Sequence, residues 1–218
     1  MTQSRIDEQR RRAGYFSVTE LLEEFGADNL IPDPYAVLIS PGVAIGRGNR
    51  FYPGIVIETG VERRIVIGDD NAFWPGSTLR AAAGGRIEIG SRNQFGPGGF
   101  TAHADGPEAV ITIADRCRSL DGASLSGRVE LGGGAQVLGP IAVQDCTLAG
   151  GGDYQTPDPD SRGAVLKGCG RARGLNLARG QVILGNGAFA EADLRPQSFF
   201  HGAAEAMPGA WLSPRSRS

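Results

Sequence analysis

Large, mostly apolar residues recur at intervals of six through the first half of the chain. They are Ile45, Phe51, Ile57, Ile67, Phe73, Leu79, Ile89, Phe95 and Thr101. Six is too long an interval for one face of an α-helix, and the alternation expected of a flat hairpin sheet is absent. The pattern predicts short strands that each turn one side chain inward and are each followed by a turn, so that three strands complete one triangular coil.

One ten-residue phrase, I-G-x-x-N-x-F-x-P-G, occurs at residues 45–54, 67–76 and 89–98 and therefore repeats every 22 residues. A fixed period of this length indicates a solenoid whose neighbouring coils bury each other's apolar faces. The proline of each phrase should stiffen the next corner. The asparagines are expected at tight corners in a left-handed backbone conformation, which asparagine tolerates; they are Asn49, Asn71 and Asn93.

Residues 37–190, which carry these repeats, resemble the hexapeptide-repeat acyltransferase superfamily. The resemblance implies an all-β solenoid, namely a left-handed parallel β-helix, and the period predicts about seven coils. We expect a helical cap at residues 1–34, the β-helix at 35–195, and a C-terminal cap with a disordered tail at 196–218.

The N-terminal region predicts a short helix that covers the open end of the first coil. Ser17 and Glu20 have the spacing of a capping box. An apolar stripe at helical spacing follows, formed by Val18, Leu21, Leu22 and Phe25. Residues 2–12 are polar and include Arg10–Arg12, for which we expect a solvated helix, with phosphate binding as the alternative.

The interval of six extends beyond the three repeats. After Thr101 the expected inward residues are Ile113, Ser119, Leu125, Leu131, Val137 and Val143, then Val165, Leu177, Ile183 and Phe189. Arg171 also falls on an inward position, which does not suit a charged side chain, so the register after Val165 stays open by one or more residues. Cys117 and Cys169 fall where the early coils carry asparagine, and we expect them to fill corners as small residues.

Composition agrees with one elongated domain. The 218 residues include 34 glycines and 13 prolines, and 40% of them are apolar, which is enough for a core. The net charge of −2 offers no general attraction to nucleic acid or to an anionic membrane, so neither is expected as a partner. No apolar run is long enough for a membrane span or a signal peptide, so we expect a cytoplasmic protein. Three widely spaced cysteines argue against a disulfide framework.

Departures from the interval of six predict where functional loops lie. Extra residues fall at one corner of three successive coils, in the segments 59–64, 81–86 and 102–109. We expect these insertions to stack along one edge, and a larger excursion leaves the solenoid at residues 150–163. Loops that project from a rigid scaffold frequently carry function.

His103 lies at the base of the third insertion and is the only histidine of the predicted solenoid. In the superfamily that the chain resembles, a histidine on such a coil takes the proton from an acceptor hydroxyl or amine that attacks an acyl thioester. Imidazole suits this role because it accepts a proton at neutral pH. We expect His103 to be the general base and Asp105 to orient it, with backbone amides of Gly98 and Gly99 polarising the thioester carbonyl. A solvated surface histidine is the alternative.

The resemblance further implies acyl-coenzyme A as co-substrate, with an acyl carrier protein as the other possible donor. Arg171, Arg173 and Arg179 are candidates for holding its phosphates, and solvent-facing arginines without this role are the alternative. The acceptor would be a small polar molecule such as a sugar or sugar nucleotide. Superfamily members usually form homotrimers, for which Tyr52 and Trp74, one position after inward phenylalanines, are a candidate contact patch.

Two other functions can be weighed against acyl transfer. A γ-type carbonic anhydrase shares the implied fold but uses three histidine zinc ligands, whereas this chain has two histidines, so no metal site is expected. A non-catalytic hexapeptide-repeat protein, serving as scaffold or ligand-binding protein, remains open because its repeats would read the same.

Overall fold

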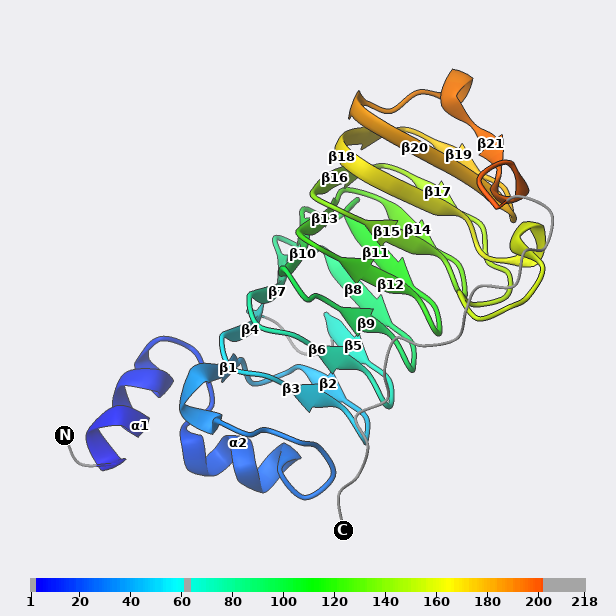
Figure 1. Cartoon of the computed structure of the whole chain (residues 1–218). Coiled ribbons are helices and arrows are strands. Elements are labelled where there is room, and N and C mark those ends of the chain that lie inside the picture. The colour runs from blue at the N-terminus through cyan, green and yellow to red at the C-terminus, as the bar shows by residue number, and fades with distance from the viewer. Residues whose placement is uncertain (1–2, 61–63, 202–218) are drawn as a thin grey trace, which may run out of the picture.

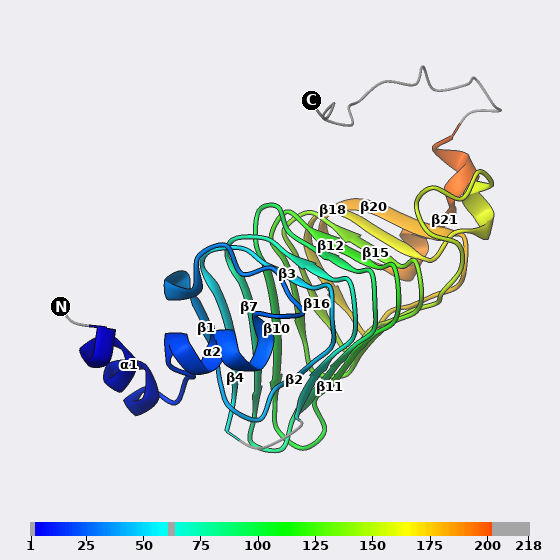
Figure 2. The ribbon, with the colours of Figure 1, turned by 90° about the horizontal axis from the view of Figure 1, so that it is seen from below.

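The computed structural model describes residues 3–60 and 64–201, which form a stack of coils with two helices at its N-terminal end (Figure 1). The helices are α1 (Gln3–Arg12) and α2 (Val18–Phe25), and the C-terminal segments lie at the opposite end of the stack. Viewed from below, successive coils lie over one another (Figure 2), and their inward side chains make one continuous core. The tail expected after His201 lies outside the described residues.

Each coil contributes a strand to each of three faces. The first face consists of β1 (Val37–Ile39), β4 (Ile55–Thr59), β7 (Ser77–Ala82), β10 (Phe100–Asp105), β13 (Ala123–Ser126) and β16 (Ile141–Gln144). The second consists of β2 (Ala44–Ile45), β5 (Ile65–Ile67), β8 (Arg86–Ile89), β11 (Val110–Ile113), β14 (Val129–Leu131), β17 (Thr147–Leu148) and β19 (Asn176–Leu177). The third consists of β3 (Arg50–Phe51), β6 (Ala72–Phe73), β9 (Gln94–Phe95), β12 (Arg118–Leu120) and β15 (Gln136–Leu138).

Two long strands, β18 (Val165–Arg173) and β20 (Gln181–Ala188), run from the third face over a corner onto the first. The first and third faces thereby join into one sheet of 14 strands, and the second face is a separate sheet of 7 strands. Short 3₁₀ helices are η1 (Pro34–Ala36), η2 (Pro159–Ser161), η3 (Glu191–Asp193) and η4 (Gln197–Phe199). Strand β21 (Arg195–Pro196) pairs antiparallel with β20, whereas the strands of the coils pair in parallel. A parallel β-helix of seven coils with an N-terminal helical cap is therefore confirmed.

The inward phenylalanines predicted from the interval of six form a stacked ladder. Phe51, Phe73 and Phe95 are fully buried, and the ring centroids of consecutive members lie 5.2 and 4.7 Å apart. Phe100 continues the stack at 4.7 Å from Phe95. Because each buried aromatic ring removes a large apolar area from water, the ladder is a principal support of the N-terminal coils.

The asparagines form a second ladder, but not in the backbone conformation predicted for them. The left-handed residue at each corner is the one before the asparagine, as at Gly48 and Asp70, whose φ angles are +69° and +58°. The asparagines themselves are buried: Asn49 Oδ1 accepts the backbone N–H of Asn71 at 3.0 Å, and Asn71 Nδ2 donates to Gly90 O at 2.9 Å. Each side chain points inward because it satisfies backbone groups of the next coil that would otherwise lack partners.

One extra glycine shifts the predicted register at the start of the fourth coil. Earlier corners carry one glycine after proline, whereas Pro97 is followed by both Gly98 and Gly99. Ala102 therefore takes the buried inward position, and Thr101 faces outward, contrary to the sequence prediction. Since side chains alternate along a strand, a shift of one residue exchanges the inward and outward sets.

The last coils show a similar offset. Leu166, not Val165, lies opposite inward Val137, and Ala172, not Arg171, is the buried neighbour on the first face. Arg171 is exposed, so the charged misfit of the predicted register disappears. The other predicted inward residues of the later coils are buried as expected; they are Ile113, Ser119, Leu125, Leu131, Val137, Val143, Leu177, Ile183 and Phe189.

The N-terminal cap contains the predicted helix and capping box. Ser17 Oγ accepts the Glu20 N–H, and the Glu20 carboxylate accepts the Ser17 N–H at 2.8 Å. These contacts satisfy the first free amides of α2, and they lower the pKa of Glu20, chiefly through its hydrogen bonds with Ser17. No helix within the described ranges is both long and apolar enough to cross a membrane.

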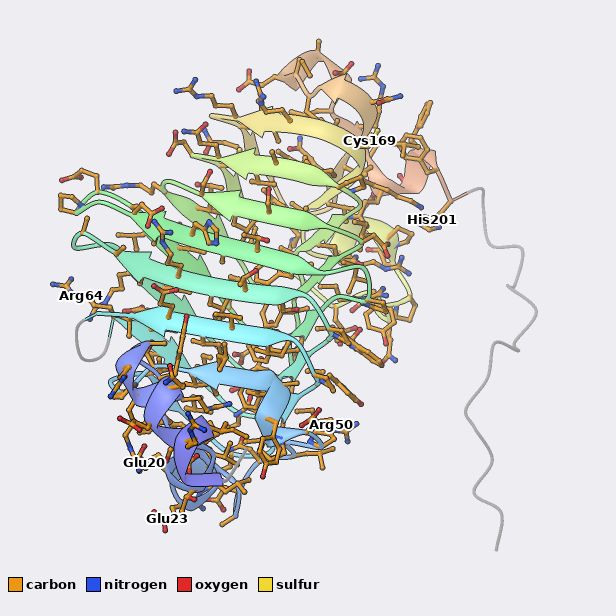
Figure 3. The ribbon with its side chains drawn as sticks, turned by 90° about the vertical axis from the view of Figure 1, so that its left-hand side faces the viewer. Glu20, Glu23, Arg50, Arg64, Cys169 and His201 are labelled. Carbon is orange, nitrogen blue, oxygen red and sulfur yellow. The ribbon has the colours of Figure 1, made fainter. Side chains whose placement is uncertain are left out.

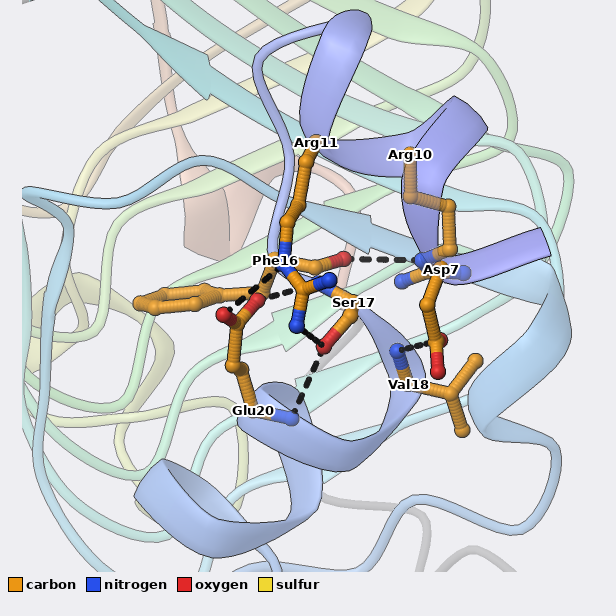
Figure 4. A network of polar contacts seen from close by, with 7 residues as sticks. All are labelled: Asp7, Arg10, Arg11, Phe16, Ser17, Val18 and Glu20. Atoms are coloured by element: carbon orange, nitrogen blue, oxygen red, sulfur yellow. Dashed lines mark hydrogen bonds and ion pairs between the residues drawn. The ribbon is translucent and has the colours of Figure 1, made fainter. Parts of the chain in front are cut away.

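Arg10 does not lie in solvent as predicted, because its side chain joins α1 to the segment before α2, at Phe16 (Figure 4), and to the first coil, at Val37. It is 7% exposed and donates to four backbone carbonyls, those of Phe16, Pro34, Tyr35 and Val37. Burial lowers the pKa of Arg10, while the nearby charge of Asp7 raises it. The carbonyl partners lie up to 27 residues away in the chain, so local composition did not reveal them.

Candidate functional site

His103 lies on strand β10, on the outer side of the first face, and not at the base of a loop as predicted. Alternation along β10 sends Ala102 and Ala104 into the core and His103 outward. The strand pairs with β7 and β13, so that His103 is opposite Arg80 on one side and Ser126 on the other. The predicted position was one residue out, because the extra glycine before β10 was not counted.

Equivalent outward positions of successive coils form a polar row along the first face, which is turned toward the viewer in Figure 3. The polar row consists of Glu58, Arg80, His103, Ser126, Gln144 and Arg173. Neighbouring strands lie about 4.8 Å apart, so the side chains of the row are within reach of one another. The His103 side chain is half-exposed and forms no hydrogen bond with any residue of the described ranges, which leaves its ring nitrogens available to a ligand.

Asp105 shares a strand with His103 but binds Arg80. Arg80 Nε and Nη2 donate to the two carboxylate oxygens of Asp105, each at 3.2 Å. The two side chains are 48% and 45% exposed, so this ion pair contributes at most about 1 kcal/mol to stability. Its structural effect is to hold the Arg80 guanidinium at Asp105, two residues beyond His103 on β10. The orienting contact predicted between Asp105 and His103 is not formed within the described part of the chain.

The N-terminal cap reaches the first member of the polar row. Tyr15 donates its hydroxyl proton to Glu58 Oε2 at 3.3 Å. Burial raises the pKa of Tyr15, and the charge and hydrogen bond of Glu58 raise it further. The phenol therefore remains a hydrogen-bond donor well above neutral pH, and the polar row begins under the cap.

The predicted insertions stack along one edge of the first face, as expected. Arg64 Nη1 donates to Gly84 O at 3.2 Å, and the Gly106 N–H donates to Ala82 O at 3.0 Å. Residues 61–63 of the first insertion lie outside the described residues. Because the turns follow the ends of β4, β7 and β10, they form a rim beside the polar row; Arg64 marks this edge in Figure 3.

Gly98 and Gly99 lie at the opposite corner, where β10 begins. Both have a φ of +86°, and a Cβ on Gly98 would lie 2.7 Å from Asp121 Cα, so the corner itself requires glycine. Gly99 precedes His103 by four residues, about 13 Å along a strand at 3.3 Å per residue. Within a single chain, the backbone amides of Gly98 and Gly99 therefore do not lie next to His103, the predicted base.

Two of the three arginines predicted to hold coenzyme A phosphates share the first face with His103. Arg173 is the last member of the polar row, and Arg171 lies two positions earlier on the same strand, β18; both are exposed. Arg179 follows β19, so the second face separates it from the other two. A ligand laid along the first face would meet Arg171 and Arg173 but not Arg179.

The cysteines differ in burial: Cys117 and Cys146 are buried, and Cys169 is partly exposed. Cys117 takes the asparagine position, as predicted, and its N–H donates to Asn93 Oδ1 at 2.7 Å. Burial raises the pKa of Cys117 to about 12, which keeps its thiol neutral. Cys169 lies on β18 opposite Asn186, so the asparagine position predicted for it is wrong. Within residues 3–60 and 64–201 no group of three or more His, Cys, Asp or Glu could hold a metal ion.

Sequence reasoning missed Arg80, the charged neighbour of His103. Glu58, Arg80 and His103 are 22 and 23 residues apart and occupy equivalent positions in successive coils. The sequence does indicate this equivalence: the second glycine after Pro97 adds one residue, so the interval from Arg80 to His103 is 23 residues and the interval from Glu58 to Arg80 is 22.

No protein-family model matches the chain, and no curated protein sequence matches it.

Proposed function

We propose that the chain is an acyltransferase of the hexapeptide-repeat type. It would move an acyl group, acetyl in the simplest case, from a coenzyme A or acyl-carrier thioester to a hydroxyl or amine of a small polar acceptor such as a sugar, in the cytoplasm. The observation that carries this proposal is the position of His103: an accessible imidazole on a rigid sheet, without a hydrogen-bond partner in the described ranges.

In this mechanism His103 is the general base. The acceptor oxygen or nitrogen attacks the thioester carbonyl while its proton passes to the imidazole. The carbon–sulfur bond breaks, a carbon–oxygen or carbon–nitrogen bond forms, and the proton passes to the departing thiolate. Arg80, held by Asp105, lies on the neighbouring strand, where its charge favours an anionic group of the donor or acceptor.

The donor is proposed to lie along the first face, with its phosphates toward Arg171 and Arg173. Within a single chain, Gly98 and Gly99 lie too far from His103 to polarise a carbonyl beside it. The amides that polarise the thioester carbonyl would therefore come from an adjacent chain of a homotrimer. Tyr52 and Trp74 support such an assembly, since their rings stack on the outside of the third face with centroids 4.7 Å apart and planes 12° apart. Light scattering at micromolar concentration tests the trimer, and a monomer would count against it.

The enzymatic test is release of thiol from acetyl-coenzyme A with a panel of amino sugars, sugar nucleotides and amino acids. His103→Ala should lower turnover about 10²- to 10⁴-fold, the usual contribution of a general base. The melting temperature should hardly change, because the side chain lies outside the core. Glu130→Gln, at an exposed outward position of β14 on the second face, is the control and should keep activity within a few-fold.

Two outcomes would reject the catalytic proposal. In one, the wild-type chain neither binds the donor nor releases thiol with any acceptor of the panel. In the other, His103→Ala is as active as wild type. Either result would favour the alternative, a non-catalytic hexapeptide-repeat scaffold or ligand-binding protein.

A further inference from the structure

A groove of about 460 Å³ lies on the outside of the third face, over the last coils. Its floor is formed by outward residues of β15, β18 and β20, including Leu138, Val165 and Leu184. One wall is the excursion at residues 150–163, and the other is the segment after β21, which contributes Gln197, Phe200 and His201. His103 lies on the first face, so this groove is a separate feature of the single chain.

The two walls of the groove are fixed to each other. Gln197 Nε2 donates to Gly163 O at 2.8 Å, and the Ser198 N–H donates to Asp160 Oδ1 at 2.9 Å. The hydrogen bonds with Ser198 are the main reason why the pKa of Asp160 is lowered. The groove is therefore a preformed site rather than a gap between independent segments, as small-molecule sites usually are.

The charged groups that line the groove are basic. They are Arg118, Arg162 and Lys167, joined by the imidazole of His201, and no Asp or Glu among residues 3–60 and 64–201 lines the groove. Arg162 donates to the carbonyls of Thr156 and Pro157, so its side chain stabilises the excursion itself. Arg118 and Lys167 form no ion pair with any residue of the described ranges. Their charges make the groove attractive to an anion.

Arg118 has hydrogen-bonding capacity that the described residues leave unused. Its guanidinium lies 4.3 Å from the centre of the Tyr154 ring, which fixes its plane over the groove wall. The buried Nε finds no partner among the described residues, and Nη1 makes only a long contact of 3.5 Å with Gln136 Oε1. Because Nε is enclosed by the protein, a ligand in the groove would meet the guanidinium through its Nη atoms, where a charge-assisted hydrogen bond is among the stronger polar contacts.

The remaining lining is apolar. Leu138, Val165, Val182 and Leu184 cover the floor, and Phe200 stands at the side. Leu184 is 49% exposed and Phe200 is 44% exposed, so the groove presents apolar surface on its outer side. Such surface favours a ligand with an apolar body.

We propose that this groove binds a small organic anion, in which a carboxylate or phosphate ester meets Arg118 and Lys167 while an aliphatic or aromatic body covers the apolar floor. The size of the groove suits such a molecule, since small-molecule sites occupy roughly 300–1,000 Å³. The proposal does not depend on catalysis at His103.

The test uses the fluorescent naphthalene sulfonate ANS, an aromatic anion, as the direct probe on the full chain. One ANS should bind per chain, and phenyl phosphate or benzoate should displace it, which also ranks phosphate against carboxylate. Benzyl alcohol, of similar size but neutral, should not displace it at a tenfold higher concentration. Arg118→Met should weaken ANS binding about tenfold or more, as expected for loss of a charge-assisted contact. Arg128→Met, which removes an exposed arginine elsewhere, should change it less than twofold.

Folding is controlled by circular dichroism and melting temperature, because ANS also binds partly unfolded protein. If Arg118→Met does not fold, Leu184→Glu decides: this exposed floor position tolerates substitution, and a carboxylate there should abolish ANS binding. Equal displacement by benzyl alcohol, or wild-type affinity in both folded variants, would overturn the proposal.

Discussion

The first coils and the last coils share three faces but are stabilised by different interactions. In the first three coils, asparagine and phenylalanine ladders link each coil to the next, and the asparagines are 22 residues apart. In the later coils Ala135 and Ala164 stand at the asparagine position, and Val137 and Leu166 stand at the phenylalanine position. Corners there close through the backbone, as where the Ala135 N–H donates to Gly132 O at 3.0 Å.

The difference shows what side-chain ladders do to a solenoid. A ladder works only if every coil presents the same side chain at the same place, so it holds the coil length nearly constant. Once the ladders end, the coil length varies. Ser124 and its equivalent Ala142 are 18 residues apart, whereas Ala142 and its equivalent Arg171 are 29 residues apart because the excursion lies between them. The groove lies where the coils are free to vary.

The junction between the two regions leaves polar groups without partners. Three buried side-chain atoms lack a hydrogen bond among the described residues: Asn93 Nδ2, Arg118 Nε and Ser119 Oγ. Asn93 is the last asparagine of its ladder, and Ser119 follows Phe95 at the phenylalanine position. The unsatisfied polar groups therefore lie at the junction between the coils that have ladders and the coils that do not. One of these residues, Arg118, also lines the groove.

The largest expected effect is on the phenylalanine ladder. Phe73→Ala removes the central ring of the stack and should lower the free energy of unfolding by about 3–5 kcal/mol. Val137→Ala, at the same inward position of a later coil, should cost about 2 kcal/mol, because it removes two methyl groups and leaves a smaller cavity. Urea denaturation of both variants measures the difference; a loss for Phe73→Ala no larger than that for Val137→Ala would show that the phenylalanine ladder is not a principal support of the early coils.

The asparagine ladder should have the next largest effect. Asn71→Ala removes the acceptor of the Asn93 N–H and the donor to Gly90 O, both at 2.9 Å, and should cost about 2–3 kcal/mol. Asn176→Ala, at an exposed position of β19, is the matched control and should cost less than about 0.5 kcal/mol. If the two variants are equally stable in urea, the ladder does not set the stability of the early coils.

The smallest expected effect concerns the junction at high pH. Burial raises the pKa of Cys117 from its ordinary 9.0 to about 12, so the unfolded thiol loses its proton first as the pH rises. The stability gained from the buried neutral thiol is complete below pH 9 and is lost between pH 9 and pH 12, roughly 1 kcal/mol of it by pH 10. Cys117→Ala should therefore flatten the decline of unfolding free energy between pH 8 and pH 10.

Cys146→Ala serves as the comparison in the later coils. Burial also raises the pKa of Cys146, so this variant should flatten the same decline. A decline that is unchanged in both variants would mean that other groups govern stability in this range.

The fold could be predicted from the sequence where each coil repeats the same chemistry. Phe51, Phe73 and Phe95 marked one inward position, and their spacing gave the coil length. His103 was placed one residue out because one glycine inserted at a corner exchanges the two sides of the next strand. Arg10 was misplaced for another reason, since its four carbonyl partners come together only when the chain has folded.

Of the groove, the sequence predicted only that one wall, residues 150–163, leaves the solenoid. Residues 150–163 stood out because they break the interval of six, but the sequence did not show that Tyr154 would face Arg118. That contact depends on where the loop returns to the solenoid and on the segment that packs against it near Gln197. Interactions between segments far apart in the chain leave no local pattern.

Strand β21 has a consequence for self-association. A stack of parallel coils presents at its end the same unpaired strand edge that joins one coil to the next, and such an edge can template the addition of another molecule into a fibre. Here Arg195–Pro196 pairs with Gln181 and Val182 in the antiparallel direction, and its proline has no N–H to offer. At the other end Leu30 bridges to Arg50 and occupies the corresponding edge. Both bridges place a segment where a further coil would add, and so oppose end-to-end growth of the solenoid.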